Sequence, residues 1–171
     1  MPLLIKFRKI KKSPVRKLER NQSTENCPCI IQRDGERVTK IRLPAKLENL
    51  GKFLNFISCL AEENGFSPSM VKEIELAAEE ALINIFNYAY PGNAGEVEIS
   101  YSKDSDSRLI LEISDNGIPF DPLSLSEPNL TANVSDRKVG GLGVIFIRKM
   151  TDDVRYRRDG DANVLTLIFS K

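Results

Sequence analysis

Hydrophobic and polar positions divide the chain into regular elements from about residue 38 onward. Runs that alternate between apolar and polar side chains predict strands at 38–43, 97–101, 109–113, 154–158 and 164–169. Apolar residues at helical spacing predict helices over 47–64, 70–89 and 140–151. Ser67-Pro68 is a typical helix start, Pro91-Gly92 breaks the second helix, and Asp159-Gly160 predicts a tight turn. The pattern therefore predicts a domain of antiparallel strands and three amphipathic helices over 38–171.

The second predicted helix has a polar stripe directly beside its apolar face. Glu73, Glu80, Asn84 and Asn87 fall on this stripe, and a second polar face that borders the core is typical of a lined cavity. Glu80 and Asn84 stand one turn apart, so a carboxylate and an amide oxygen project side by side, able to place a base and hold Mg²⁺. An exposed Glu-Asn pair explains the spacing alone equally simply.

Asp115 follows the strongly apolar run 109–113, so we expect its carboxyl group at the edge of the sheet and buried. A buried carboxylate needs hydrogen-bond donors, and the exocyclic amine of adenine is one. Gly117 would let a flat base approach the backbone closely. A turn-forming Asp in an Asx motif is the alternative reading of this segment.

Glycines open the third predicted helix. Gly140-Gly141-Leu142-Gly143 offers unencumbered N–H groups at a positive helix end, the usual means of binding phosphate, and Lys138 just before it adds charge. A glycine hinge is the plainer alternative. The preceding segment 121–139 has little periodicity and is predicted to be a lid over the site.

Composition excludes several classes of chemistry. The chain has 171 residues and no histidine, which removes Ser-His-Asp and Cys-His catalysis and histidine autophosphorylation together. Three cysteines without an export signal predict plain thiols. Since no apolar run is long enough to span a bilayer, we expect a cytoplasmic protein.

Charge is distributed unevenly along the chain. Residues 1–20 hold eight of the 25 Lys and Arg and one of the 24 Asp and Glu, so the rest of the chain is acidic by six charges. We interpret 1–37 as a basic arm that could be disordered. It could contact nucleic acid, membrane or an acidic partner, but a solvated tail or a misplaced start codon is the simpler interpretation.

Three ordered phrases, E80-A-L-I-N84, D115-N-G-I-P-F-D-P122 and G140-G-L-G-V144, resemble the N, G1 and G2 boxes of the GHKL ATPases. Ala89-Tyr90-Pro91-Gly92 and the segments 152–158 and 163–167 resemble those of anti-sigma-factor serine/threonine protein kinases of the RsbW type. The match covers about residues 38–171.

The resemblance implies a Bergerat-type α/β sandwich, with a mixed, mostly antiparallel sheet and helices on one face. It implies ATP and Mg²⁺ as cofactors, Glu80 as the base, Asn84 as the Mg²⁺ ligand and Asp115 as the adenine reader. The implied nucleotide contacts are Gly117, Lys138, Gly140, Gly141, Leu142 and Gly143.

The resemblance further implies partners. These are a STAS-type anti-anti-sigma protein as substrate, a sigma factor that is sequestered, and a second copy of the chain in a homodimer, with no direct contact to nucleic acid or membrane. The alternative function is a switch in which ATP only gates protein binding, without transfer of phosphate.

Two positions depart from the family pattern. Some relatives carry Thr on the closing strand as a further adenine contact, where this chain has Val164 or Thr166, and this contact stays unassigned. A partner-binding Arg of the first helix corresponds to Lys52, which cannot make the same bidentate contacts.

Overall fold

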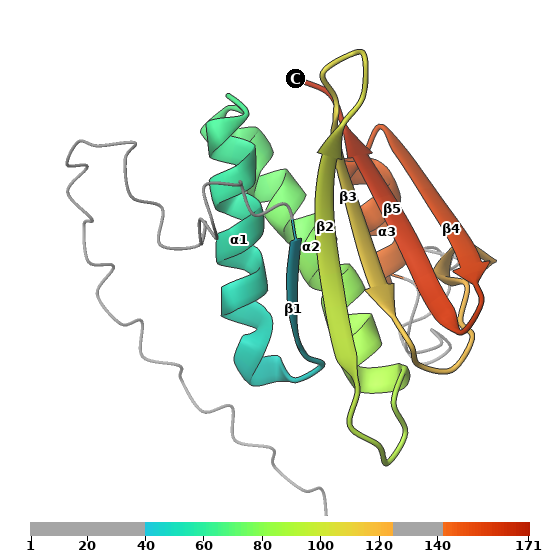
Figure 1. Ribbon diagram of the computed structural model, residues 1–171. Coiled ribbons are helices and arrows are strands. Elements are labelled where there is room, and N and C mark those ends of the chain that lie inside the picture. Colours follow the sequence, from blue (N-terminus) through green and yellow to red (C-terminus); the bar gives the residue numbers. More distant parts are fainter. Residues whose placement is uncertain (1–39, 125–141) are drawn as a thin grey trace, which may run out of the picture.

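A computed structural model describes residues 40–124 and 142–171, which form one sheet covered by helices on one face (Figure 1). The sheet has five strands in the order β1-β2-β3-β5-β4, and each neighbouring pair is antiparallel. The strands are β1 (Lys40–Pro44), β2 (Glu96–Lys103), β3 (Leu109–Asp115), β4 (Asp153–Asp159) and β5 (Ala162–Phe169). The predicted two-layer α/β fold class is confirmed, and every pairing in the described ranges is antiparallel. The predicted arm 1–37 lies outside the described residues.

The helices correspond to the three predicted from periodicity. A short 3-10 turn, η1 (Leu47–Asn49), leads into α1 (Leu50–Glu63), which is followed by α2 (Pro68–Tyr88). A second 3-10 turn, η2 (Pro122–Ser124), ends the first described range, and α3 (Leu142–Met150) begins the second. The Ser67 hydroxyl caps α2 by accepting from the Met70 N–H at 3.4 Å, with Pro68 in the first turn as predicted. α2 packs against both other helices and so lies in the middle of the helical layer (Figure 1).

The core forms where α2 and its neighbours cover the inner face of β3 and β5. Along these paired strands the inward residues match as Leu109 with Phe169, Leu111 with Leu167 and Ile113 with Leu165. All six are buried. Burial of apolar surface stabilises the fold by about 25 cal/mol for each Å² removed from water. The row ends in a polar pair, Asp115 with Asn163, both also buried. The change from apolar to polar along one row marks the start of the site.

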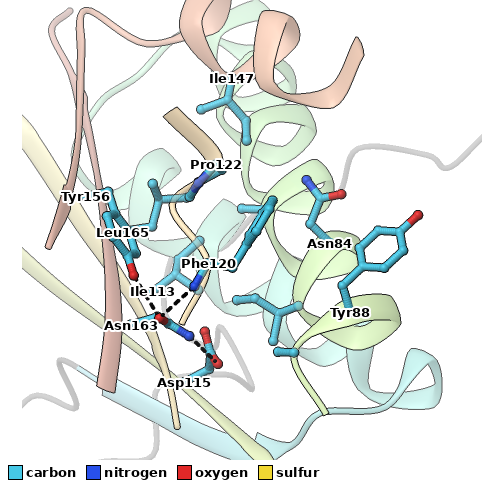
Figure 2. Close-up of a pocket in the computed structure, with 13 residues that line it drawn as sticks. Asn84, Tyr88, Ile113, Asp115, Phe120, Pro122, Ile147, Tyr156, Asn163 and Leu165 are labelled. Carbon is cyan, nitrogen blue, oxygen red and sulfur yellow. Dashed lines mark hydrogen bonds between the residues drawn. The ribbon is translucent and has the colours of Figure 1, made fainter. Parts of the chain in front are cut away.

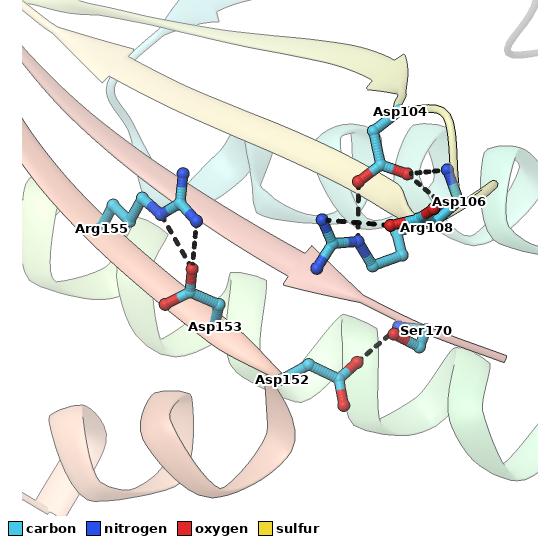
Figure 3. Close-up of polar contacts among 7 residues, drawn as sticks. All are labelled: Asp104, Asp106, Arg108, Asp152, Asp153, Arg155 and Ser170. Atoms are coloured by element: carbon cyan, nitrogen blue, oxygen red, sulfur yellow. Dashed lines mark hydrogen bonds and ion pairs between the residues drawn. The ribbon is translucent and has the colours of Figure 1, made fainter.

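The opposite end of the sheet is closed by polar contacts at the surface (Figure 3). In the β2–β3 loop, Asp104 accepts from the backbone N–H groups of Asp106 and Arg108, both at 3.0 Å, and from the Arg108 side chain at 2.6 Å. At the same end of the sheet, Asp152 accepts from the Ser170 N–H and so joins the start of β4 to the end of β5. These groups satisfy one another and hold the strand ends together.

Two chemical expectations can be compared with the structure. Cys59 on α1 is disulfide-bonded, so the prediction that all three cysteines are plain thiols is wrong. The prediction rested on an odd number of cysteines without an export signal, and neither feature reports which cysteines come close in the fold. Within the two described ranges, no helix is both long and apolar enough to cross a membrane.

Candidate functional site

A pocket opens between α2, the end of β3, the start of β5 and α3 (Figure 2). The space between its walls, with the open mouth included, is about 490 Å³. Its walls are mainly apolar and aromatic, with Asp115 and Asn163 at one side and Asn84 at the other. The lining residues are Ala81, Asn84, Ile85, Tyr88, Ala89, Ile113, Asp115, Phe120, Pro122, Ile147, Tyr156, Asn163 and Leu165. Such a lining suits a flat, partly polar group such as a nucleobase.

Asp115 is the acidic group of this pocket, and its side chain is only 4% exposed. Its Oδ1 accepts from the Gly117 N–H at 2.7 Å and from the Asn163 Nδ2 at 3.1 Å. Burial raises the pKa of Asp115 above its ordinary value, while these two hydrogen bonds and the charge of Arg158 act in the opposite direction. The prediction of a buried carboxyl at the sheet edge is confirmed.

Gly117 is required by packing, because it lies against the end of α2. A Cβ atom at this position would stand 2.5 Å from both the Cβ and the carbonyl oxygen of Ala89, and 2.7 Å from Asp115 Oδ1. The next residue, Ile118, donates its N–H to the Ala89 carbonyl at 2.9 Å. The loop after β3 is therefore fixed to the helix end, and a side chain at 117 would push the two apart.

Tyr90 fixes the same loop from the other side. Its hydroxyl donates to the Glu96 carbonyl at 2.8 Å and accepts from the Asn116 N–H at 2.9 Å. Its ring lies over Gly95, where a Cβ atom would come within 2.0 Å of the ring. Burial, above all, raises the pKa of Tyr90, so its hydroxyl stays a donor at neutral pH. The Ala89-Tyr90-Pro91-Gly92 phrase thus positions the loop that follows Asp115.

Glu80 and Asn84 meet α3 at its first turn. A Cβ atom at Gly143 would stand 2.6 Å from Glu80 Oε2 and 3.5 Å from Asn84 Nδ2, so both side chains lie against the glycine backbone. Asn84 also lines the pocket, and Figure 2 shows it on the wall opposite Asn163. Glu80 is partly exposed and does not line the pocket, but its carboxylate lies beside Gly143 at the start of α3. Glu80 and Asn84 therefore lie between the pocket and the first turn of α3.

The other predicted residues have different positions. Lys138, Gly140 and Gly141 lie outside the described residues, and Leu142 is the first residue of α3 with a side chain that is not described. Glu73, of the same polar stripe, is exposed and lines a separate cleft with Lys149 and Asp152.

The residue that sequence reasoning missed is Asn163. It pairs with Asp115 across β3 and β5, whereas Val164 and Thr166 stand on the other face of the sheet, where the Thr166 hydroxyl faces Glu112 at 3.4 Å. Neither of the two residues considered for the closing-strand contact lines the pocket. The alternation of β5, counted back from Leu165 and Leu167, places Asn163 on the inner face and was the available signal.

A magnesium ion with a nucleotide fits the donor set of this site. Mg²⁺ prefers oxygen ligands and usually keeps waters and phosphate oxygens, so one amide such as Asn84 is a suitable protein ligand. The described residues hold no group of three or more metal-binding side chains.

Known proteins share this arrangement. The model of the family "Histidine kinase-like ATPase domain" matches residues 43–169. The "Serine-protein kinase RsbW" of Bacillus cereus (strain AH187) is 30% identical over 141 residues, which span 76% of this chain and 84% of the relative. The protein of the same name from Bacillus thuringiensis (strain Al Hakam) is 29% identical with the same coverage.

A solved structure agrees at the level of the fold. The RsbU and RsbW domains of Rv1364c from Mycobacterium tuberculosis match with a TM-score of 0.54 and 12% identity, over 78% of this chain and 32% of that one. The chain belongs to the histidine kinase-like ATPase domain family, which is of the GHKL type, and within it to the RsbW-type serine-protein kinases.

Proposed function

We propose that this protein is an ATP-dependent serine/threonine protein kinase and anti-sigma factor. It phosphorylates a small STAS-type anti-anti-sigma protein in the cytoplasm, and it sequesters a sigma factor in another state, acting as a homodimer. The observation that carries the proposal is the juxtaposition of Glu80 and Asn84 with Gly143, beside a pocket that ends in the buried carboxyl of Asp115.

The pocket supports a division of labour among its residues. Asp115 accepts from the exocyclic amine of adenine, while Ile113 and Leu165 provide an apolar surface for the ring. Asn84, on the opposite wall, offers its amide oxygen to Mg²⁺ near the start of α3. The N–H groups of the first turn of α3 and the positive end of the helix favour phosphate. Gly117, Lys138, Gly140, Gly141, Leu142 and Gly143 complete the proposed nucleotide contacts.

Glu80 is the proposed base. Bound Mg-ATP supplies the phosphoryl group that is transferred. Glu80 accepts the proton of the incoming serine hydroxyl as the new O–P bond forms, and the bond from the γ-phosphorus to the bridging oxygen breaks to leave ADP. With no histidine in the chain, a carboxylate is a suitable residue for this step.

The test separates binding from chemistry. Glu80→Gln keeps the shape of the side chain and removes its basicity, so ATP affinity should stay within a few-fold while transfer of labelled phosphate falls by ~10² or more. The partner is first isolated by pull-down with Mg-ATP and with Mg-ADP, and identified by mass spectrometry. Absence of transfer by the parent protein would replace the kinase by an ATP-gated binding switch. Transfer that survives E80Q would leave the kinase and reject this base.

The magnesium assignment has its own test. Asn84→Ala should weaken Mg-dependent ATP binding much more than metal-free ADP binding, because only the first uses the amide oxygen as a ligand. Isothermal titration calorimetry in magnesium and in chelator measures both. Equal losses under the two conditions would indicate a damaged α2 and contradict the assignment.

A further inference from the structure

The Asn163 side chain has a hydrogen-bond partner on each of its atoms. Its Nδ2 donates to Asp115 Oδ1 at 3.1 Å and to the Ile118 carbonyl at 3.0 Å. Its Oδ1 accepts from the Tyr156 hydroxyl at 2.9 Å and from Arg158 Nη1 at 2.8 Å. Oδ1 also accepts from the Phe120 N–H at 3.4 Å. Three donors around the oxygen and two acceptors around the nitrogen fix the orientation of the amide. Its N–H group must therefore face Asp115 (Figure 2).

The geometry of Asp115 complements this fixed amide. Within residues 40–124 and 142–171, both hydrogen bonds that Asp115 receives end on Oδ1, so this part of the chain leaves Oδ2 for a ligand in the pocket. We propose that Asn163 is a positioning residue that holds Asp115 as an ionised acceptor with Oδ2 presented to the ligand, and thereby sets selectivity for a base with an exocyclic amine. The inference rests on the proposed function, since it takes Asp115 to read adenine.

An apolar residue at position 163 would extend the inner row of β5 and pack against the core. The polar side chain is buried there instead, which costs free energy unless its hydrogen bonds are made. Its hydrogen bonds to β3, β4 and the loop after β3 all converge beside the pocket. A residue needed only for packing would not require this pattern.

The electrostatic surroundings of Asp115 agree with this role. Burial raises its pKa, and the hydrogen bonds from Gly117 and Asn163, followed by the charge of Arg158 on β4, lower it. The other titratable groups near it are phenols. Tyr88 on α2 and Tyr156 on β4 line the same pocket, and the charge of Asp115 helps to raise the pKa of Tyr90. Among the described residues, Arg158 is the charged group whose effect on the pKa of Asp115 opposes that of burial.

The experiment measures selectivity against pH. The ratio of the dissociation constants of purine riboside 5′-triphosphate and ATP isolates the contact to the 6-amino group, because the two ligands share the same titrating phosphates. In the parent protein the ratio should be about tenfold or more at high pH, and should fall as the pH drops through the pKa of Asp115.

Asn163→Asp should invert this profile. Two carboxyl groups about 3 Å apart cannot both ionise without strong repulsion, so they share a proton. The ratio for N163D should be near one at high pH and should rise as the pH falls, when the shared proton restores a donor to Asp115. T166V, which changes the opposite face of β5, should behave like the parent.

Asn163→Ala provides a second measurement if N163D does not fold in a thermal melt. Loss of the Asn163 donor raises the pKa of Asp115. As the pH is lowered, the ratio of the two dissociation constants should therefore fall to near one at a higher pH than in the parent. If either variant shows a lower ratio of the two dissociation constants but the same dependence on pH as the parent, Asn163 only supports the structure, and the inference is overturned. A ratio near one in the parent at every pH would instead reject the adenine assignment of the proposed function.

Discussion

Two aspartates on either side of strand β3 have opposite surroundings. Asp104 lies in the loop before the strand, where the backbone N–H and then the guanidinium group of Arg108 lower its pKa. Asp115 is the last residue of the strand, where burial raises its pKa. Asp104 is satisfied on both oxygens by its own loop, whereas Asp115 receives hydrogen bonds from the described residues on one oxygen. The Asp104 carboxylate, which closes a turn, has its hydrogen bonds made by its own loop, whereas the carboxyl group proposed to bind a ligand is held through one oxygen.

The largest expected difference between the two concerns nucleotide affinity. Asp115→Ala should cost ~1.5 to 3 kcal/mol of ATP binding, the scale of a charge-assisted hydrogen bond, and should remove the preference for ATP over GTP. Asp104→Ala should leave both unchanged. Calorimetry on the parent and the two variants checks this, and equal affinity of the parent for ATP and GTP would contradict the assignment.

A smaller effect is expected from crowding Glu80. In Gly143→Ala the new methyl group would come within 2.6 Å of the Glu80 carboxylate, the mobile end of a side chain, so Glu80 should move while the fold persists. Phosphate transfer should fall by ~10- to 100-fold, since small displacements of a reacting group are costly. The matched control is Gly51→Ala in α1, where no atom lies within 4 Å of the new Cβ and helix stability should rise by up to about 1 kcal/mol.

Parent-like transfer by G143A would show that the position of Glu80 does not matter to the reaction. A G51A variant with reduced transfer would show that the assay responds to any change in a helix. The expected pair, intact transfer in G51A and reduced transfer in G143A at similar melting temperatures, would locate the sensitivity at the start of α3.

The dependence of stability on pH should have opposite sign at the two aspartates. The folded pKa of Asp115 is raised above 3.8, so the stability that its protonated form contributes is lost as the pH rises from that value through the folded pKa. Asp115→Asn should abolish this loss. Nucleotide-free urea unfolding of parent and variant between about pH 3 and pH 8 measures it. A difference that does not change with pH would contradict the raised pKa.

The smallest effect is expected at Asp104. Its folded pKa is lowered below 3.8, so the stability that its ionised form contributes is present above that value and is lost as the pH falls through the folded pKa. Asp104→Asn should be slightly less stable than the parent at neutral pH, and the gap should close in acid. Since the group is exposed, the change is small, and a gap that widens in acid would reject this account.

Much of the fold was predictable because each element carries its own signal. The alternation of 109–113 and the helical spacing after Ser67-Pro68 gave β3 and α2 almost at their observed bounds. The burial of Asp115 followed from the apolar strand before it. These inferences need only local sequence, and local sequence determines which face of an element is apolar.

The missed features depend on which segments pair over a distance. Asn163 becomes a partner of Asp115 only through the β3–β5 register, which no short-range pattern contains. Glu73 and Asn84 share a helical stripe, yet α3 packs along α2 so that they line different pockets. Periodicity could not supply these relations.

The register of β5 also determines when the site can form during folding. The β4–β5 hairpin needs only a short turn around Gly160, but β5 must also pair with β3, and Asp115 and Asn163 are 48 residues apart in sequence. Contacts between distant residues form late because closing a long loop costs entropy. A nascent chain that has emerged only as far as α3 already contains Glu80, Asn84 and Asp115, but it lacks the strand that holds the Asp115 carboxyl group. The capacity to bind a nucleotide should therefore arise after residues 162–169 have left the ribosome, so that ligand binding reports the completion of the sheet.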